Sequence, residues 1–329
     1  MGYSPAREAM KRVSFACRMT RGVLVLSCAL GLAQETVFRV DVRLVRLLAV
    51  VKNAAGELVG ALNKEDFEVY DNGVKQELAI FERRTEQPLS VALLVDTSLS
   101  TAKELEYELG SVSRFFQAMF AEGNPQDAVA LYSFNYEVAL VSDFTIRRAR
   151  LEDALKRLRS EGGTSLYDAL YLTSRDLADR EGRRVIVVVT DGGDTTSTKK
   201  FHDALQAAQL ADAVIYAILV MPITSDAGRN IGGENALAVL TSGTGGRVFT
   251  PSVGPTLDGA FLDILKELRT QYFLAYYPKN APPSPDRFHR LEVRLKDPRL
   301  RVLARSGYYG DSGPERSAES QGWRPAPKN

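Results

Sequence analysis

The chain has 329 residues, 45% of them apolar and 25% charged, which is the composition of a globular protein with a substantial core. Its length is a soft indication of two domains. The formal net charge is only +1, so the composition gives no basic field that would favour binding to nucleic acid.

Residues 1–33 have the pattern of a secretory signal peptide. They carry five basic residues against one acidic residue, followed by the apolar run Gly22–Leu32 and small residues up to Ala33. The run is shorter than the roughly 20 residues of a membrane span, so we expect cleavage, export to the envelope or exterior, and no membrane span in the mature chain. An uncleaved N-terminal anchor and lipid attachment at Cys28 are the alternatives. Both cysteines, Cys17 and Cys28, lie here, so the mature chain would contain no disulfide and no thiolate metal site.

Residues 34–88 are predicted to form β structure. Apolar and polar side chains alternate from Phe38 to Leu44, as in a half-buried strand. Asn72-Gly73 separates the runs Asp66–Tyr70 and Leu78–Phe81, which is a strong hairpin signal. These few strands need a partner sheet to bury their apolar face.

Residues 89–270 alternate between strands and helices, which predicts a doubly wound, mostly parallel α/β sheet with helices on both faces. We expect a first helix over 101–120, with Thr101 and Glu104 as its capping box. Strands 129–134 and 138–141 form a hairpin, which predicts one antiparallel edge strand. The remaining strands are expected at 91–95, 185–189, 214–220 and 247–249, and the remaining helices around 151–158, 166–170, 205–210, 234–242 and 257–268.

Residues 271–309 return to a β pattern. Strands are expected at Tyr272–Tyr277, Leu291–Leu295 and Leu300–Ala304. They have no helices to cover them, so we expect them to pack with residues 34–88 in a smaller β-sandwich-like domain into which the α/β domain is inserted. Residues 310–329 are rich in Ser, Gly, Pro and charge and are predicted to be disordered.

Three polar segments follow or flank the strands of the predicted sheet. Asp96-Thr97-Ser98-Leu99-Ser100 ends the first buried strand, Gly162-Gly163-Thr164-Ser165 lies between two helices, and Asp191-Gly192-Gly193 ends the next parallel strand. Ligands of open α/β sheets bind at the carboxyl ends of strands, so one edge of the sheet is expected to carry all three segments. A purely structural interpretation is also open: Asp96 and Asp191 would then cap turns, and the serines would serve the next helix.

Here the sequence resembles the von Willebrand factor type A family, whose metal-ion-dependent adhesion site combines D-x-S-x-S with a downstream Thr and a downstream Asp. The similarity covers roughly residues 89–270, and no ligand position departs from the pattern. The resemblance implies the metal ligands Asp96, Ser98, Ser100, Thr164 and Asp191.

The flanks are similar to those of secreted bacterial proteins related to this family. The motif L-x-K-E-D-F-x-V-x-D-x-G runs from Leu62 to Gly73, and strands containing Tyr276-Tyr277-Pro278 and Phe288-His289-Arg290 follow the α/β domain.

The donor set favours a hard cation. Hydroxyl and carboxylate oxygens suit Mg²⁺, with Mn²⁺ or Ca²⁺ as alternatives, and the lack of nearby Cys or His argues against zinc. Two carboxylates balance one divalent ion, which leaves it able to accept one more anionic oxygen. The resemblance implies that an Asp or Glu of a protein partner supplies that oxygen.

The sequence therefore favours a binding module over an enzyme. A Mg²⁺-dependent hydrolase or phosphotransferase with Asp96 as nucleophile is one alternative, but the haloacid dehalogenase pattern needs a second Asp where this chain has Ser98. An architectural envelope protein with a vestigial site is the other alternative.

Overall fold

The computed structural model describes residues 44–83, 86–102, 105–220, 230–251, 256–282 and 284–310. The predicted signal peptide, residues 38–43 of the first predicted strand, Glu104 of the predicted capping box and residues 311–329 of the predicted disordered tail lie outside this part. No helix within these ranges combines the length and the apolar character that crossing a membrane requires.

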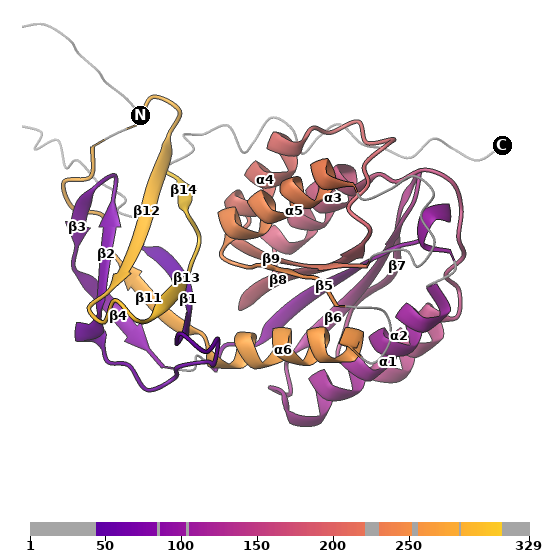
Figure 1. Cartoon of the computed structure of the whole chain (residues 1–329), viewed down its shortest axis with the longest axis horizontal. Coiled ribbons are helices and arrows are strands. Elements are labelled where there is room, and N and C mark those ends of the chain that lie inside the picture. The colour runs from indigo at the N-terminus through magenta and orange to yellow at the C-terminus, as the bar shows by residue number, and fades with distance from the viewer. Residues whose placement is uncertain are drawn as a thin grey trace, which may run out of the picture. The chain divides into compact units, whose positions relative to one another are not determined.

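A six-stranded sheet forms the centre of the α/β domain (Figure 1). Every residue of β5 (Leu89–Asp96), the first strand of this sheet along the chain, is buried, as expected for a strand with helices on both faces. Five strands are parallel to their neighbours, and the last in the order is antiparallel, which confirms the predicted edge hairpin. The order is β10 (Val248–Phe249), β9 (Ala213–Leu219), β8 (Arg183–Thr190), β5 (Leu89–Asp96), β6 (Ala128–Phe134) and β7 (Val138–Thr145).

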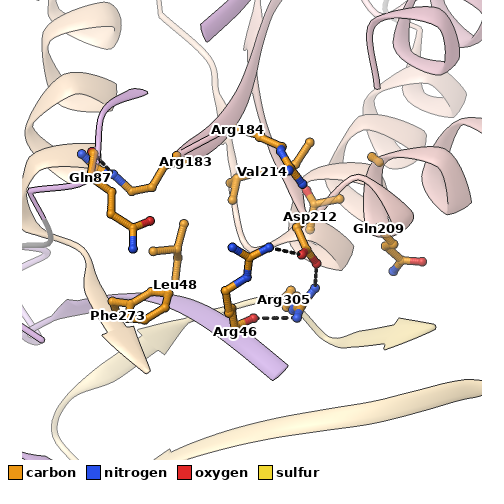
Figure 2. Close-up of a pocket in the computed structure, with 14 residues that line it drawn as sticks. Arg46, Leu48, Gln87, Arg183, Arg184, Gln209, Asp212, Val214, Phe273 and Arg305 are labelled. Atoms are coloured by element: carbon orange, nitrogen blue, oxygen red, sulfur yellow. Dashed lines mark hydrogen bonds and ion pairs between the residues drawn. The ribbon is translucent and has the colours of Figure 1, made fainter. Parts of the chain in front are cut away.

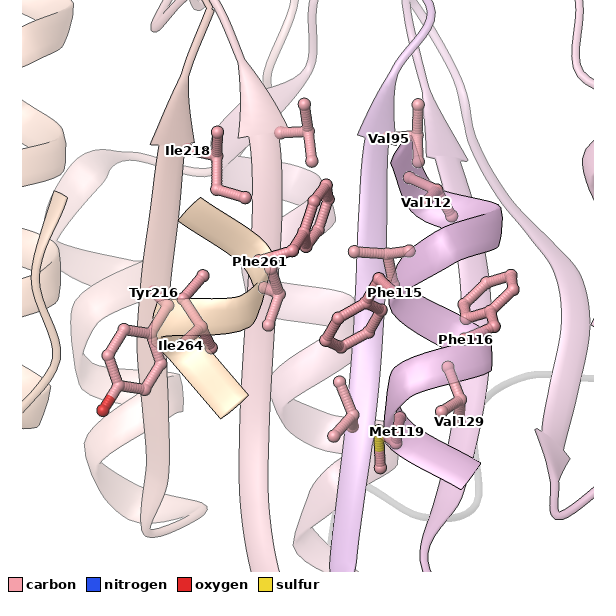
Figure 3. Packing of buried hydrophobic residues seen from close by; sticks show 14 of the residues in the cluster. Val95, Val112, Phe115, Phe116, Met119, Val129, Tyr216, Ile218, Phe261 and Ile264 are labelled. Atoms are coloured by element: carbon pink, nitrogen blue, oxygen red, sulfur yellow. The ribbon is translucent and has the colours of Figure 1, made fainter. Parts of the chain in front are cut away.

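Helices cover both faces of this sheet (Figure 1). One face packs against α1 (Leu105–Glu122), α2 (Arg148–Leu155) and α6 (Thr256–Thr270); the other packs against α3 (Leu166–Ala178), α4 (Phe201–Leu210) and α5 (Ile231–Thr244). Figure 3 shows the first core, where the rings of Phe115 and Phe261 lie 5.0 Å apart between α1 and α6. The predicted fold class is confirmed.

A 3₁₀ turn lies where the sequence predicts the start of the first helix. Residues 99–101 form this turn, and α1 is described from Leu105. The hydroxyl of Thr101 donates to the carbonyl oxygens of Asp96 (3.0 Å) and Ser98 (3.1 Å), so it closes the turn after β5. Because Glu104 lies outside the described residues, the predicted capping box stays a prediction.

The flanking segments form two four-stranded sheets that share one buried core. Each sheet mixes strands from before and after the α/β domain, as the sequence predicts. The first has the order β13 (Arg301–Leu303), β1 (Val45–Lys52), β11 (Tyr272–Tyr276) and β4 (Leu78–Glu82); the second has β14 (Gly307–Tyr309), β12 (Phe288–Leu295), β2 (Phe67–Asp71) and β3 (Val74–Gln76).

The predicted Asn72-Gly73 turn is present, but its second strand differs from the prediction. Both residues have positive φ (45° and 82°), as a two-residue hairpin turn needs. The turn joins β2 to the short strand β3, and not to the run Leu78–Phe81. That run belongs to β4 and pairs with β11 in the other sheet. The sequence interpretation also missed β1 and β14.

A buried acid connects the two flanking sheets. Asp71 of β2 is fully buried, and its carboxylate accepts hydrogen bonds from the hydroxyls of Tyr276 and Tyr308, each at 2.8 Å. The Nδ1 atom of His289 lies 2.8 Å from the second carboxylate oxygen. Burial and the neighbouring Asp71 raise the pKa of both tyrosine hydroxyls.

A second buried acid connects α6 to β1. Glu267 of α6 is 1% exposed, and its Oε1 atom lies 2.6 Å from Lys52 Nζ and 2.7 Å from Arg247 Nη2. One carboxylate therefore holds a cation from the flanking β structure and a cation at the start of β10.

Candidate metal centre

The strand order places the candidate site at a switch point of the sheet. From β5 the chain continues on one side through β6 and β7, and later fills the other side with β8, β9 and β10. Helices on opposite faces then diverge at the carboxyl end of β5, which leaves a crevice in doubly wound sheets. Asp96 is the last residue of β5, and Asp191 directly follows the neighbouring strand β8.

Asp96 is fully buried and tightly held. Its Oδ1 atom accepts the amide of Ser98 (2.9 Å), and its Oδ2 atom accepts the hydroxyl of Thr190 (2.6 Å). Burial raises the pKa of Asp96 to about 6; the hydrogen bonds from Thr190 and Ser98 oppose this, and the negative charge of Asp191 adds to it. The two carboxylates are therefore close enough to repel each other.

Ser98 and Ser100 bring two hydroxyl oxygens together. The 3₁₀ turn places Ser98 Oγ 2.9 Å from Ser100 Oγ. Adjacent oxygen ligands of an octahedral Mg²⁺ with bonds of about 2.0–2.1 Å lie about 2.9 Å apart. Ser98 is 2% exposed, whereas Ser100 is exposed to solvent. The pair therefore has the spacing of two neighbouring ligands, and one of them is open to the outside.

Thr164 is held in place by the loop after β8. Its amide donates to the hydroxyl of Thr195 (2.9 Å), and its carbonyl oxygen accepts the amides of Thr195 (2.8 Å) and Thr196 (3.1 Å). Its preceding segment also approaches the first loop, because Glu161 N donates to Thr97 O at 2.9 Å. Thr164 thus lies between the loops that carry Asp96 and Asp191.

Asp191 and Thr164 face a common space beside Gly193. The Asp191 Oδ1 atom accepts the amide of Gly193 at 2.9 Å. A Cβ atom added to Gly193 would lie 3.1 Å from Asp191 Oδ1 and 4.0 Å from Thr164 Oγ1. Any side chain at this position would enter the space between two of the predicted ligands.

The residues present fit a divalent cation. The carboxylates of Asp96 and Asp191 lie near each other, since the charge of Asp191 raises the pKa of Asp96, and a divalent cation would balance both charges. The described part of the chain contains no group of three or more His, Cys, Asp and Glu side chains that could hold a metal ion. A cation here would depend on the hydroxyl oxygens of Ser98, Ser100 and Thr164. The turn bonds of Asp96 and Asp191 also match the structural interpretation, so the ligand set remains a prediction.

The sequence interpretation missed the residues that support these side chains. Thr190 donates to Asp96, and Thr195 fixes Thr164, although neither belongs to the predicted ligand set. Threonine in a polar loop gives no signal of this kind, because its partner comes from a segment distant in sequence. The two histidines lie elsewhere: His202 is exposed on α4, and His289 contacts Asp71.

Comparison with known proteins locates a family match in the same region. The family described as von Willebrand factor type A domain matches residues 91–193. A search of curated proteins gave no match.

Several solved structures are similar to this chain at low identity. BatB, a conserved hypothetical protein from Bacteroides thetaiotaomicron, is 18% identical with a TM-score of 0.45, covering 55% of this chain and 98% of that one. The vWF domain of the type V pili tip protein Mfa5 from Porphyromonas gingivalis is 17% identical with a TM-score of 0.45, covering 55% and 94%. The pilus adhesin SpaC from Lactobacillus rhamnosus GG is 11% identical with a TM-score of 0.47, covering 79% and 47%. Residues 91–193, which match the von Willebrand factor type A domain family, include all five predicted ligands.

Proposed function

We propose that this protein is a protein-interaction module that binds a partner carboxylate through Mg²⁺ held by Asp96, Ser98, Ser100, Thr164 and Asp191. The observation that carries the proposal is the 2.9 Å separation of the Ser98 and Ser100 hydroxyl oxygens beside the buried Asp96. Manganese or calcium would use the same hard oxygen ligands.

The predicted ligands would contribute in different ways to binding the ion. The bound ion would supply a positive centre that attracts an Asp or Glu side chain of the partner. Ser98 and Ser100 offer neutral oxygens, while Asp96 and Asp191 offer the charge that balances the ion. Because Asp96 is buried and Ser100 is exposed, the free face of the site lies on the Ser100 side.

Exposed apolar side chains lie on segments next to this free face. Leu99 is 65% exposed, Tyr136 is 52% exposed and Ile231 is 64% exposed. Leu99 lies between the two serines, Tyr136 N donates to Gly162 O (3.1 Å), and Ile231 begins α5 beside the Asp191 loop. Large exposed apolar side chains around a polar centre are typical of a protein-binding surface, and they favour a partner polypeptide over a small ion.

The alternative of catalysis by Asp96 has less support. A nucleophilic carboxylate must reach the atom that it attacks, whereas Asp96 is fully buried and each of its oxygens already accepts a hydrogen bond. Turnover of an aryl phosphate that disappears in Asp96→Asn would support catalysis instead. For the site of action we propose the envelope or the exterior, in line with the signal peptide predicted for residues 1–33.

Calorimetric titration of Mg²⁺ into the metal-free protein tests the proposal. Ser100→Ala removes an exposed hydroxyl and should weaken binding at least about tenfold without unfolding the domain. Ser242→Ala removes an exposed serine at the end of α5 and should have no effect. In envelope extracts with Mg²⁺, the wild type and Ser242→Ala should capture partners better than Ser100→Ala. A chelator should abolish the difference. A wild-type protein that binds Mg²⁺ no better than the Ser100 variant would refute the proposal.

A further inference from the structure

A basic pocket lies at the opposite end of the parallel sheet from the candidate metal centre. It has a volume of about 50 Å³ and forms where β1 and the segment after β13 meet the first residues of β8 and β9 (Figure 2). Such a volume holds a few water molecules or one small ion. Its lining includes Arg46, Arg183, Arg184, Arg305 and a single acid, Asp212.

The positive charge in this pocket exceeds the negative charge. Four guanidinium groups face one carboxylate. Arg183 donates to the carbonyl oxygens of Gln87 and Leu268, and Arg184 donates to those of Arg180 (2.7 Å) and Ala211 (2.7 Å). Carbonyl oxygens satisfy hydrogen bonds but carry no full negative charge, so the opposing charges come from carboxylates that are not bonded to these two arginines: Asp127 for Arg183, and Asp212 and Asp179 for Arg184.

Asp212 forms ion pairs with the other two arginines of the pocket, Arg46 and Arg305. Its carboxylate accepts hydrogen bonds from Arg46 Nη2 (3.3 Å) and Arg305 Nη1, and Figure 2 shows the three side chains together. Asp212 is held in position by a left-handed turn (φ 52°) between α4 and β9. One carboxylate shared by two arginines leaves a net positive charge even at this point.

Arg305 has a donor that the structure leaves without an acceptor. Its side chain is 10% exposed, and its Nε atom is buried with no hydrogen-bond partner among the described residues. A buried N–H group without an acceptor is costly, and an oxyanion in the pocket would supply that acceptor. Burial makes the charged form of two other arginines in the pocket less favourable. It lowers the pKa of Arg183 to about 10, and burial together with the charge of Arg46 lowers the pKa of Arg184.

We propose that this pocket binds a small oxyanion, a phosphate or sulfate group, between Arg46, Arg184 and Arg305. Guanidinium groups recognise such oxygens through paired, charge-assisted hydrogen bonds. The apolar side chains of Leu48 and Phe273 form one wall (Figure 2), so the ligand is screened from bulk water on that side. A simpler role is open to the same residues: Arg46 and Arg305 would only clamp Asp212 and thereby join β1 to the α/β domain.

Sulfate and phosphate titrations of the full chain distinguish these two roles. Calorimetry and thermal unfolding are measured with EDTA present, so that the candidate metal centre plays no part, and against sodium chloride at equal ionic strength. The oxyanion proposal predicts saturable binding and a rise in melting temperature. Arg46→Gln should weaken binding about tenfold, which is ~1.4 kcal/mol. Arg299→Gln removes an exposed arginine outside the pocket and should leave binding unchanged.

Asp212→Asn gives the sharpest contrast. Without its carboxylate the pocket lining contains four arginines and no acid, so the oxyanion proposal predicts binding about tenfold tighter and recovery of lost stability by sulfate. A clamp alone predicts lower stability that sulfate does not restore. Vesicles with and without phosphatidylglycerol show whether the group belongs to a lipid headgroup or to a free ion. No saturable binding in either the wild type or Asp212→Asn would overturn the proposal.

Discussion

Gly193→Ala tests whether the space beside Asp191 belongs to a metal site. The added methyl group would lie 3.1 Å from Asp191 Oδ1, whereas ordinary contact begins at 3.4 Å. The carboxylate must therefore move by a few tenths of an ångström. The Gly193 backbone does not adopt the left-handed conformation that favours glycine, so alanine should not strain the chain.

The expected loss follows from the precision that metal ligands require. Binding sites need their groups within about 0.5 Å of the productive geometry, and changes to the surroundings of metal ligands cost about 10–100-fold in affinity. For a shift of this size we expect about tenfold weaker Mg²⁺ binding, or ~1.4 kcal/mol. The free energy of unfolding without metal should change by less than about 0.5 kcal/mol.

Calorimetric titration of Mg²⁺ measures this loss, and Gly162→Ala is the matched control. A Cβ atom at Gly162 meets only Leu99 Cδ1 at 3.9 Å, an ordinary contact, so its affinity should equal that of the wild type. If the Gly193 variant binds Mg²⁺ as tightly as the Gly162 variant while both stay folded, Asp191 is not a ligand and the proposed geometry fails.

Three stability predictions follow from the buried contacts. Glu267→Ala leaves two partly buried cations without their acid and should lower the free energy of unfolding by about 2 kcal/mol. Asp263→Ala on the same helix removes an exposed ion pair and should lower it by less than about 0.5 kcal/mol. Urea unfolding compares the two variants, and equal losses would contradict the stabilising role of Glu267. Gly246→Ala would place a methyl group 2.0 Å from a carbonyl oxygen of β9 and should lower the free energy of unfolding by about 3 kcal/mol. In α6, a methyl group at Gly259 meets nothing within 4 Å, so Gly259→Ala should raise the free energy of unfolding by about 0.5–1 kcal/mol. The two variants should therefore shift the melting temperature in opposite directions. Asp71→Ala leaves three donors without their acceptor and should cost about 3 kcal/mol in guanidinium unfolding; wild-type stability would show that the network is dispensable.

The α/β part could be predicted well because its pattern is local. Continuous apolar runs such as Val185–Val189 occur in strands that are buried on both faces, and amphipathic stripes separate them. The flanking strands were harder. The run Leu78–Phe81 follows the Asn-Gly turn closely in sequence, yet it crosses to the other sheet and pairs with β11, while the short strand β3 pairs with β2. Strand pairing over more than 190 residues leaves no local signal.

The candidate site could be predicted only as far as its motif reached. The pentapeptide from Asp96 to Ser100 and the downstream Thr164 and Asp191 are visible in the sequence. The threonines that hold them are not, because a hydroxyl such as that of Thr190 has no recognisable pattern until β5 and β8 lie side by side. Nor does the sequence indicate that the hydroxyl of Thr101 donates to carbonyl oxygens of the preceding turn.

The loop contacts hold the side chains of the candidate site through the protein's own hydrogen bonds. Ser98 Oγ and Ser100 Oγ are in hydrogen-bond contact with each other, Asp96 accepts from a strand hydroxyl and a loop amide, and the backbone of Thr164 is fixed by three hydrogen bonds. A structural zinc site, by contrast, supplies much of the folding free energy of its domain. Here the protein's own bonds position the oxygens, so under the proposed function the free energy of metal binding would be available for recognition of a partner. Such an arrangement suits a surface whose affinity depends on the ion while its fold does not.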